Sequence, residues 1–161
     1  MAHALHFAPG MQRISDALEL LTAQHDEIEA LLAEIATSGN TGRRALAITE
    51  LADAVTVHLA AEQELFYPAV AADISPAVHA ELLAENSEIK RLLADLVWLE
   101  HGDNRLERKL VALRTLVDHH VTWQENELFE AVAERHSEQE LAAIGGAMRG
   151  WIDSLVVYAA A

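Results

Sequence analysis

The chain has 161 residues, with 11 Lys and Arg against 26 Asp and Glu, which gives a formal net charge of −15. This charge argues against nucleic acid as a partner, because phosphates require basic groups, and against docking on anionic membranes. The absence of cysteine excludes disulfides and thiolate metal ligands. No apolar run approaches the roughly 20 residues that span a bilayer, and residues 1–10 lack the features of a secretory signal, so we expect a cytoplasmic protein.

Alanine and leucine dominate the sequence, while proline (3) and glycine (7) are scarce, and this composition favours helices. The first helix is predicted at about residues 11–36. Its seam advances in alternating steps of four and three, which is the spacing of a bundle helix. The seam consists of Ile14, Leu18, Leu21, His25, Ile28, Leu32 and Ile35. Residues 38–42, rich in Gly, Ser and Asn, predict a turn.

The second helix is predicted at about residues 43–72, with a seam of the same spacing. This seam consists of Ile48, Leu51, Val55, His58, Glu62, Leu65 and Ala69. Ser75 is then a suitable N-cap for a third helix, with Pro76 in its first turn, where proline is tolerated. The third helix is predicted to end near His101 and Gly102, because glycine suits a C-terminal cap.

A fourth helix is predicted at about residues 104–135, and a shorter fifth helix at about residues 137–157. Ser137 and Glu140 have the spacing of a capping box for this fifth helix. Short turns between long helices favour antiparallel neighbours. We therefore predict an all-α fold, an up-down-up-down four-helix bundle with a short C-terminal fifth helix. The whole chain is predicted to be one domain, with the bundle core at roughly 11–135.

Polar residues occupy seam positions in the middle of three predicted helices, where leucine is expected. They are His25, His58, Glu62 and His120. Burying an unpaired polar group costs about 1–3 kcal/mol, and a metal ion can compensate this cost. His58 and Glu62 are four residues apart, so they share a helix face and can reach one ion. A buried His58–Glu62 hydrogen bond without metal is the alternative interpretation.

Three segments resemble the ligand motifs of the hemerythrin-like (HHE cation-binding) family, over about residues 15–135. Residues 58–68, HLAAEQELFYP, contain a histidine, a glutamate four residues later and then a proline, as in the family's second helix. Residues 24–28, QHDEI, are similar to the first-helix motif, and residues 120–129, HVTWQENELF, to the fourth-helix motif. The three segments also occur in the family's order.

The resemblance implies a non-haem iron site, mono- or dinuclear, with another divalent metal as a further option. By resemblance, the ligands carry over to His25, His58, Glu62 and His120. Asn86 stands where the family's third helix has a histidine, and Leu82 stands where an additional histidine is frequent. Asn86 or Glu85 could substitute, but an amide binds iron poorly compared with imidazole. We therefore predict fewer than two tightly held metal ions per chain.

The fourth helix offers one further carboxylate. Glu125 lies five residues after His120, the spacing that oxygen-carrying members of the family use for an aspartate, whereas Gln124 lies four residues after it. We predict that Glu125 rather than Gln124 faces the metal, because a carboxylate neutralises a cation and an amide does not. The candidate metal ligands are therefore His25, His58, Glu62, His120 and Glu125.

The resemblance implies a protein that binds, senses or handles a small ligand, such as oxygen, nitric oxide or peroxide. A metal-dependent redox enzyme with catalase-like chemistry, or one that consumes NO or peroxide, is the first alternative. Histidine and carboxylate ligands permit redox cycling but do not require it. The second alternative is a metal-free helical bundle that binds a partner protein, and the replaced third-helix histidine is its best support.

Overall fold

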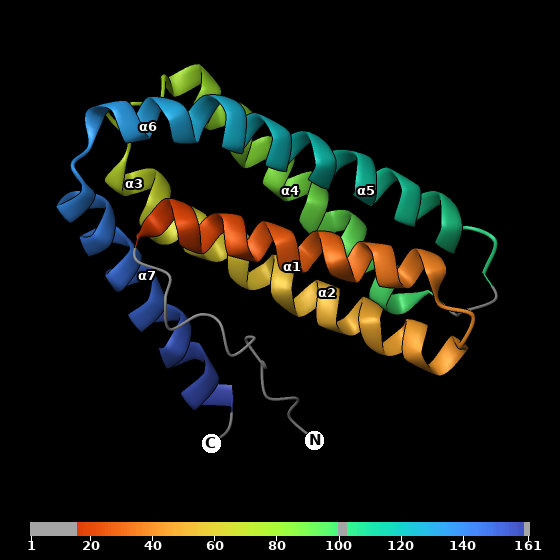
Figure 1. Ribbon diagram of the computed structural model, residues 1–161. Coiled ribbons are helices and arrows are strands. Elements are labelled where there is room, and N and C mark those ends of the chain that lie inside the picture. The colour runs from red at the N-terminus through yellow and green to blue at the C-terminus, as the bar shows by residue number, and fades with distance from the viewer. Residues whose placement is uncertain (1–15, 100–102, 160–161) are drawn as a thin grey trace.

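The computed structural model describes residues 16–99 and 103–159. These residues form helices joined by short turns, and no β-strand occurs among them (Figure 1). The expected all-α class is therefore confirmed for this part of the chain. Within the same residues, no helix is both long enough and apolar enough to cross a membrane.

The first two helices are α1 (Ala17–Thr37) and α2 (Thr41–Ala61). Each begins at a polar N-cap: the side chain of Asp16 accepts a hydrogen bond from the first turn of α1, and that of Asn40 from the first turn of α2. The turn between them is shorter than residues 38–42, because Thr41 is already helical. Figure 1 shows α2 returning beside α1.

The bundle has four long continuous helical segments, called rods here, and α1 is the first. The second rod begins with α2 and changes its helical type at Glu62. From α2, the chain continues without a break into a π-helical turn, η2 (Glu62–Phe66), and then into α3 (Tyr67–Ala69). A π-helical turn carries an extra residue and occurs frequently at functional sites.

The fourth rod repeats this arrangement. It consists of α5 (Leu106–Trp123), the π-helical turn η3 (Gln124–Leu128) and α6 (Phe129–Arg135). Each π-helical turn therefore begins four residues after a histidine, His58 in one rod and His120 in the other.

The third rod is α4 (Pro76–Trp98). The hydroxyl of Ser75 accepts a hydrogen bond from the backbone N–H of Val78 over 3.2 Å, so Ser75 is the N-cap as predicted. The C-terminal cap expected at Gly102 lies outside the described residues. The four rods lie alongside one another in Figure 1, whereas their strict up-down-up-down order stays a prediction.

The C-terminal helix α7 (Glu138–Ala159) begins at the predicted capping box. Ser137 Oγ accepts from the N–H of Glu140 over 3.3 Å, and Glu140 Oε2 accepts from the N–H of Ser137 over 2.8 Å. The expectation of a short helix is wrong, since α7 has 22 residues against 21 in α1. Gly145 lets α7 approach α1, because a Cβ at this position would lie 2.6 Å from the backbone of Asp16. The helix buries apolar residues such as Met148 against the bundle.

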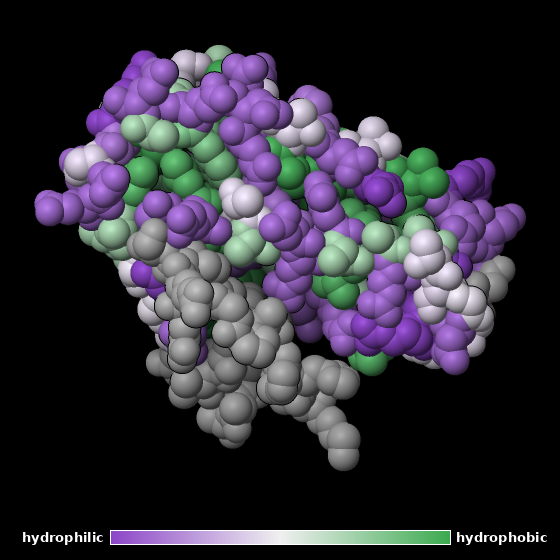
Figure 2. Space-filling model, in the orientation of Figure 1, coloured by the Kyte–Doolittle hydropathy of each residue, from purple (hydrophilic) through white to green (hydrophobic). Residues whose placement is uncertain are grey.

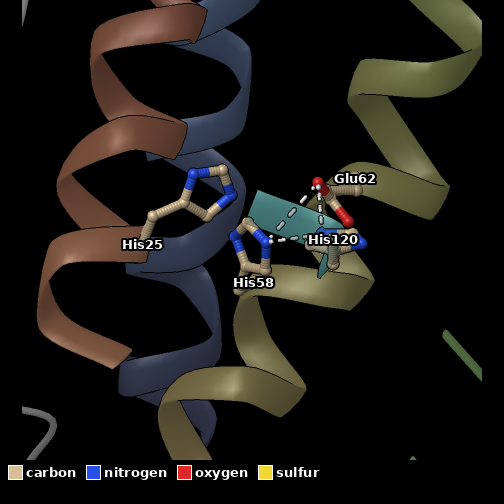
Figure 3. A group of neighbouring side chains, drawn as sticks. All are labelled: His25, His58, Glu62 and His120. Carbon is tan, nitrogen blue, oxygen red and sulfur yellow. Dashed lines mark hydrogen bonds and ion pairs between the residues drawn. The ribbon is translucent and has the colours of Figure 1, made fainter. Parts of the chain in front are cut away.

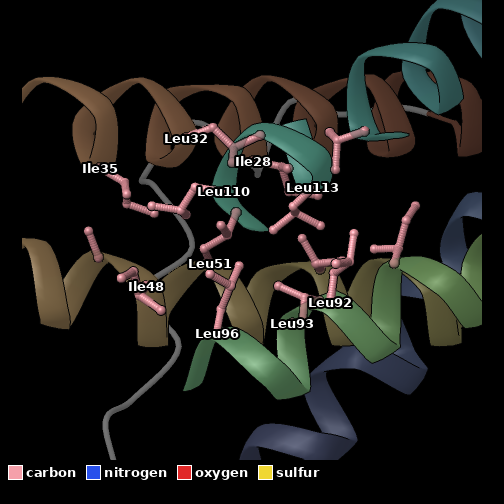
Figure 4. Close-up of a cluster of buried hydrophobic side chains, with 14 of the residues drawn as sticks. Ile28, Leu32, Ile35, Ile48, Leu51, Leu92, Leu93, Leu96, Leu110 and Leu113 are labelled. Atoms are coloured by element: carbon pink, nitrogen blue, oxygen red, sulfur yellow. The ribbon is translucent and has the colours of Figure 1, made fainter. Parts of the chain in front are cut away.

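The interior contains two apolar clusters. The apolar end lies between α1, α2, α4 and α5 and includes Ile28, Leu32, Leu51, Leu96 and Leu113 (Figure 4). The second cluster is covered in part by α7. The face of the molecule in Figure 2 is mostly hydrophilic, with apolar side chains scattered over it, as a net charge of −15 leads one to expect.

Candidate metal centre

Four of the five candidate ligands converge in the interior of the bundle. His25 comes from α1, His58 from α2 and His120 from α5, while Glu62 is the first residue of η2. One ligand atom from each of these side chains lies within 4.8 Å of those of the others. None of the four residues is more than 3% exposed. Figure 3 shows the three imidazoles and the carboxylate pointing toward one another, as the seam spacing predicts.

The imidazoles of His25 and His58 are each fixed from the outside through Nδ1. His25 Nδ1 forms a 2.8 Å hydrogen bond with Glu125 Oε1, and His58 Nδ1 forms a 3.1 Å hydrogen bond with Gln24 Oε1. Both acceptors require the proton on Nδ1, which leaves Nε2 with a free lone pair. Such partners orient metal-binding histidines and select their tautomer.

His120 has a carboxylate on its outer side as well. Its Nδ1 lies 3.3 Å from Glu85 Oε1, and Glu85 Oε2 forms a 3.1 Å hydrogen bond with Nδ1 of His119. Glu85, expected as a possible replacement ligand, therefore contacts the outer edge of His120 and does not join the cluster. The side chain of His119 is 69% exposed.

The inward atoms form a donor set that fits a metal ion. His58 Nε2 lies 3.5 Å from Glu62 Oε1 and 3.5 Å from His120 Nε2, and His120 Nε2 lies 3.6 Å from Glu62 Oε1. His25 Nε2 is buried and has no hydrogen-bond partner within the described part of the chain. An orphaned buried nitrogen costs about 1–3 kcal/mol. Three imidazoles and one carboxylate are ligands that suit Fe, Zn or Mn.

The cluster is electrostatically coupled. Burial lowers the pKa of His58 to about 3, and burial likewise lowers the pKa of His25 despite its bond to Glu125. Burial opposes the charged form of His120 too, but Glu62 and Glu85 outweigh it and raise the pKa to about 9. Burial alone would raise the pKa of Glu62, whereas His58 and His120 lower it to about 2. Glu62 therefore favours its anionic form beside His120, whose raised pKa favours the cationic form.

The prediction that Glu125 rather than Gln124 faces the site is wrong. Gln124 is fully buried, and its Nε2 donates to Glu62 Oε1 over 2.5 Å. The side chain of Glu125 is 35% exposed and reaches the site through the Nδ1 of His25. A second carboxylate beside Glu62 would place two like charges in a buried space, whereas an amide donates a hydrogen bond to the first. Glu125 is therefore a partner of a histidine and lies outside the four-residue cluster.

The two residues of α4 that differ from the family motif, Asn86 and Leu82, also lie in the interior. Asn86 is fully buried, and neither its Oδ1 nor its Nδ2 has a hydrogen-bond partner within residues 16–99 and 103–159. Leu82 is buried one turn earlier on α4. Both side chains are neutral, so this side of the interior lacks the imidazoles that the family motif would supply.

A cavity of about 10 Å³ lies beside the three imidazoles, which is close to the space that one water molecule requires. Apart from the histidines, its walls are apolar side chains: Ile28, Val55, Leu59, Ile89, Val117 and Val121. A cavity of this size and polarity suits a molecule of two or three atoms.

Gln24 is a residue that the sequence interpretation did not assign to the site. It is 4% exposed and fixes His58 through a hydrogen bond across two helices. Its signal in the sequence is weak, because it lies directly before His25 and off the main seam. Tyr67, whose hydroxyl donates to Glu62 Oε2 over 3.1 Å, is part of the same network, and burial and Glu62 raise its pKa.

A helical bundle with buried histidine and carboxylate ligands on facing helices belongs to the class of bundles that hold metal ions in their core. The model of the hemerythrin HHE cation-binding domain matches residues 16–132. The chain belongs to this family, and the resemblance seen in the sequence motifs is confirmed.

The chain is also similar to one protein of known structure and to one named for its activity. The crystal structure of a hemerythrin HHE cation-binding domain-containing protein from Mycobacterium kansasii, a homologue of Rv2633c, has a TM-score of 0.78 and 23% identity, covering 89% of this chain and 88% of that chain. At this identity the likeness shows the fold. A DNA nickase from Nostoc sp. (strain PCC 7120) is 25% identical over 122 residues, or 76% of this chain. The match spans 35% of the nickase, about a third of its length.

Proposed function

We propose that this protein binds one non-haem iron ion and that the ion handles oxygen, nitric oxide or peroxide. The proposed ligands are His25 Nε2, His58 Nε2, Glu62 Oε1 and His120 Nε2. The observation that carries the proposal is their convergence within 4.8 Å in a buried site. The three outer partners Gln24, Glu85 and Glu125 support it, because they turn the imidazoles so that Nε2 faces inward.

Iron is favoured by the chemistry of the donor set. Imidazole and carboxylate ligands suit iron, and a protein that supplies four ligands to an ion of higher coordination number leaves positions open for a small molecule. When bound, ferrous iron would supply the affinity for oxygen or nitric oxide and the redox chemistry toward peroxide. Another divalent metal would use the same atoms, so metal identity has to be measured.

The size of the ligand follows from the cavity beside the imidazoles. A volume of about 10 Å³ with six apolar wall residues excludes an organic substrate of ordinary size and favours an apolar diatomic molecule. The same walls limit the access of water to the site, which strengthens electrostatic interactions within it.

Metal analysis of anaerobically purified protein tests the proposal. We expect about one iron per chain in the wild type and a loss of most of it in His58→Ala. His119→Ala is the matched control, since this histidine is adjacent to a proposed ligand but 69% exposed, and it should retain the metal. Wild-type protein that takes up no iron, cobalt or zinc would refute the proposal and leave the metal-free partner-binding bundle.

A redox enzyme is the second candidate, and the buried Tyr67 hydroxyl favours it. This hydroxyl lies 3.1 Å from Glu62 Oε2, where it can hold a proton close to the site. Repeated consumption of peroxide by the iron-loaded protein would support the enzyme, whereas a single stoichiometric reaction would support a binding role. We do not extend the nickase activity to this chain, because a net charge of −15 disfavours contact with DNA.

A further inference from the structure

Glu62 is held by neutral hydrogen-bond donors on both of its carboxylate oxygens. Gln124 Nε2 donates to Oε1 over 2.5 Å, and the hydroxyl of Tyr67 donates to Oε2 over 3.1 Å. Gln124 Nε2 also donates to the Tyr67 hydroxyl over 2.8 Å, which closes a triangle of three side chains. All three residues are at most 1% exposed. The carboxylate is therefore fixed in its rotation as well as its position.

The two oxygens of Glu62 have different surroundings. Oε1 faces the imidazoles, at 3.5 Å from His58 Nε2 and 3.6 Å from His120 Nε2. Oε2 accepts the hydroxyl proton of Tyr67. A carboxylate that bridges two metal ions must give one oxygen to each. In this chain, the Tyr67 hydroxyl lies 3.1 Å from Oε2, in the position beside this oxygen that a second ion would need, whereas Oε1 accepts from Gln124 and still faces the imidazoles.

The region around Oε2 is also poor in ligands. Tyr67, which contacts Oε2, is approached by the neutral amides of Gln124 and Asn86, whose amide oxygens have no hydrogen-bond partner in the described residues. The ring of the exposed His79 lies on the outer side, with its centroid 6.1 Å from that of Tyr67. Neutral amides bind transition metals weakly compared with imidazole or carboxylate. Among the described residues, the four proposed ligands are the one group of three or more such side chains that could hold an ion.

We propose that Tyr67 and Gln124 are positioning residues that hold Glu62 as a one-oxygen ligand and thereby make the centre mononuclear. The inference rests on the proposed function, since it concerns the same site. It assigns the exclusion of a second ion to the Tyr67 hydroxyl beside Oε2, which Gln124 holds in place through its own bond to that hydroxyl, in addition to the missing imidazoles at positions 82 and 86.

Titration of the full-length chain with Co²⁺, followed by visible absorption, tests the role of Tyr67. We expect about one equivalent in the wild type. Tyr67→Phe removes the bond to Oε2, so Glu62 can bind the ion through both oxygens, and the absorption should shift and lose intensity as the coordination number rises. Val132→Ala is the control: it removes packing from the same apolar cluster but leaves the hydroxyl, and its Co²⁺ spectrum should match the wild type.

A second set of variants tests the exclusion itself. The variant Tyr67→Phe/Gln124→Glu/Asn86→His frees Oε2 and adds a carboxylate and an imidazole on that side. We expect its metal content to rise from about one to about two equivalents of Co²⁺. The control Gln63→Glu/Asn126→His makes two of the same changes at less buried positions in η2 and η3 and should stay at one equivalent.

The outcomes separate the inference from the proposed function. A wild type that binds no metal refutes both. A wild type that binds one ion, with an unchanged spectrum in Tyr67→Phe and one equivalent in the triple variant, refutes the inference alone. A wild type that holds two ions firmly also overturns the inference, because Glu62 would then bridge despite Tyr67 and Gln124. If the triple variant fails to fold, the spectrum of Tyr67→Phe still decides the role of the hydroxyl.

Discussion

The apolar end of the bundle and the histidine level, which is the region around His25, His58, Glu62 and His120, lie on the same helices. They differ in the kind of side chain that they bury. At the apolar end, leucine, isoleucine and valine fill the space between α1, α2, α4 and α5, and their burial is stabilising by itself. Around the three histidines, buried nitrogen and oxygen atoms such as His25 Nε2 and Asn86 Oδ1 have no hydrogen-bond partner among the residues that the structure describes. Each such atom costs stability unless a ligand satisfies it.

This difference indicates a division of labour along each helix. In α1, Ile28 lies one turn from His25, so a single amphipathic helix carries packing and ligand atoms at successive levels. We expect the apolar end to determine whether the chain folds and the histidine level to determine what it binds.

The largest effect is expected at the apolar end. Leu51 is fully buried there (Figure 4), and Leu51→Ala should lower the free energy of unfolding by about 2–5 kcal/mol through lost burial and a cavity. Urea unfolding with and without metal should give the same loss. Val111→Ala, at a residue that is 66% exposed, is the control and should change stability by less than about 0.5 kcal/mol. A loss that disappears when metal is added would break the division.

Metal-linked stability should depend on the histidine level alone. At a free Zn²⁺ concentration of about 100 times the Kd, the wild type should gain about 2.7 kcal/mol, because the ion binds the folded state. Leu51→Ala should keep this gain, whereas His25→Ala should lose most of it. Thermal unfolding at several metal concentrations measures both. Equal gains in wild type and His25→Ala would show that zinc binds elsewhere.

The outer partners of the histidines should have an intermediate effect. Gln24→Leu removes the acceptor for His58 Nδ1 while keeping the volume, so we expect metal affinity to fall roughly 10–100-fold. Competition with a chelator of known affinity measures the change. Gln139→Leu, at an exposed position of α7, is the matched control. An affinity within a factor of about two of the wild type would mean that packing alone orients His58.

The sequence predicted the four clustered residues because seam spacing and the family motifs agree at His25, His58, Glu62 and His120. It also located the caps at Ser75 and Ser137, since capping depends on residues close in sequence. These features are local or periodic, and patterns of both kinds can be recognised in a single sequence.

Which of Gln124 and Glu125 faces the interior could not be predicted from such local or periodic patterns. The choice of Glu125 considered only the charge of the expected metal and not the nearby Glu62, which comes from another helix. The structure supplies that neighbour, and the amide of Gln124 satisfies it. The predicted bounds of the C-terminal helix, about residues 137–157, lie within two residues of those of α7, although the helix was expected to be short.

The smallest effect concerns an ion pair that belongs to neither region. Asp73, before α4, accepts hydrogen bonds from His136 over 2.7 Å and from Arg135 over 3.2 Å. Burial alone would raise the pKa of Asp73, but these two bonds outweigh it and lower the pKa below its usual value. The contact therefore stabilises the fold above the unfolded pKa of about 3.9, and this contribution is lost as the pH falls through the lower, folded value.

Asp73→Asn should remove this contribution, which we expect to be under about 1 kcal/mol because Arg135 is 59% exposed and the pair is screened. Urea unfolding at pH 6 and pH 3 should show a smaller loss of stability on acidification in Asp73→Asn than in the wild type, while Asp53→Asn, at an exposed position of α2, should follow the wild type. If Asp73→Asn instead cost as much as Leu51→Ala, the stability of the bundle would depend on the contact between the connections that precede α4 and α7, and the apolar end would not be its main source.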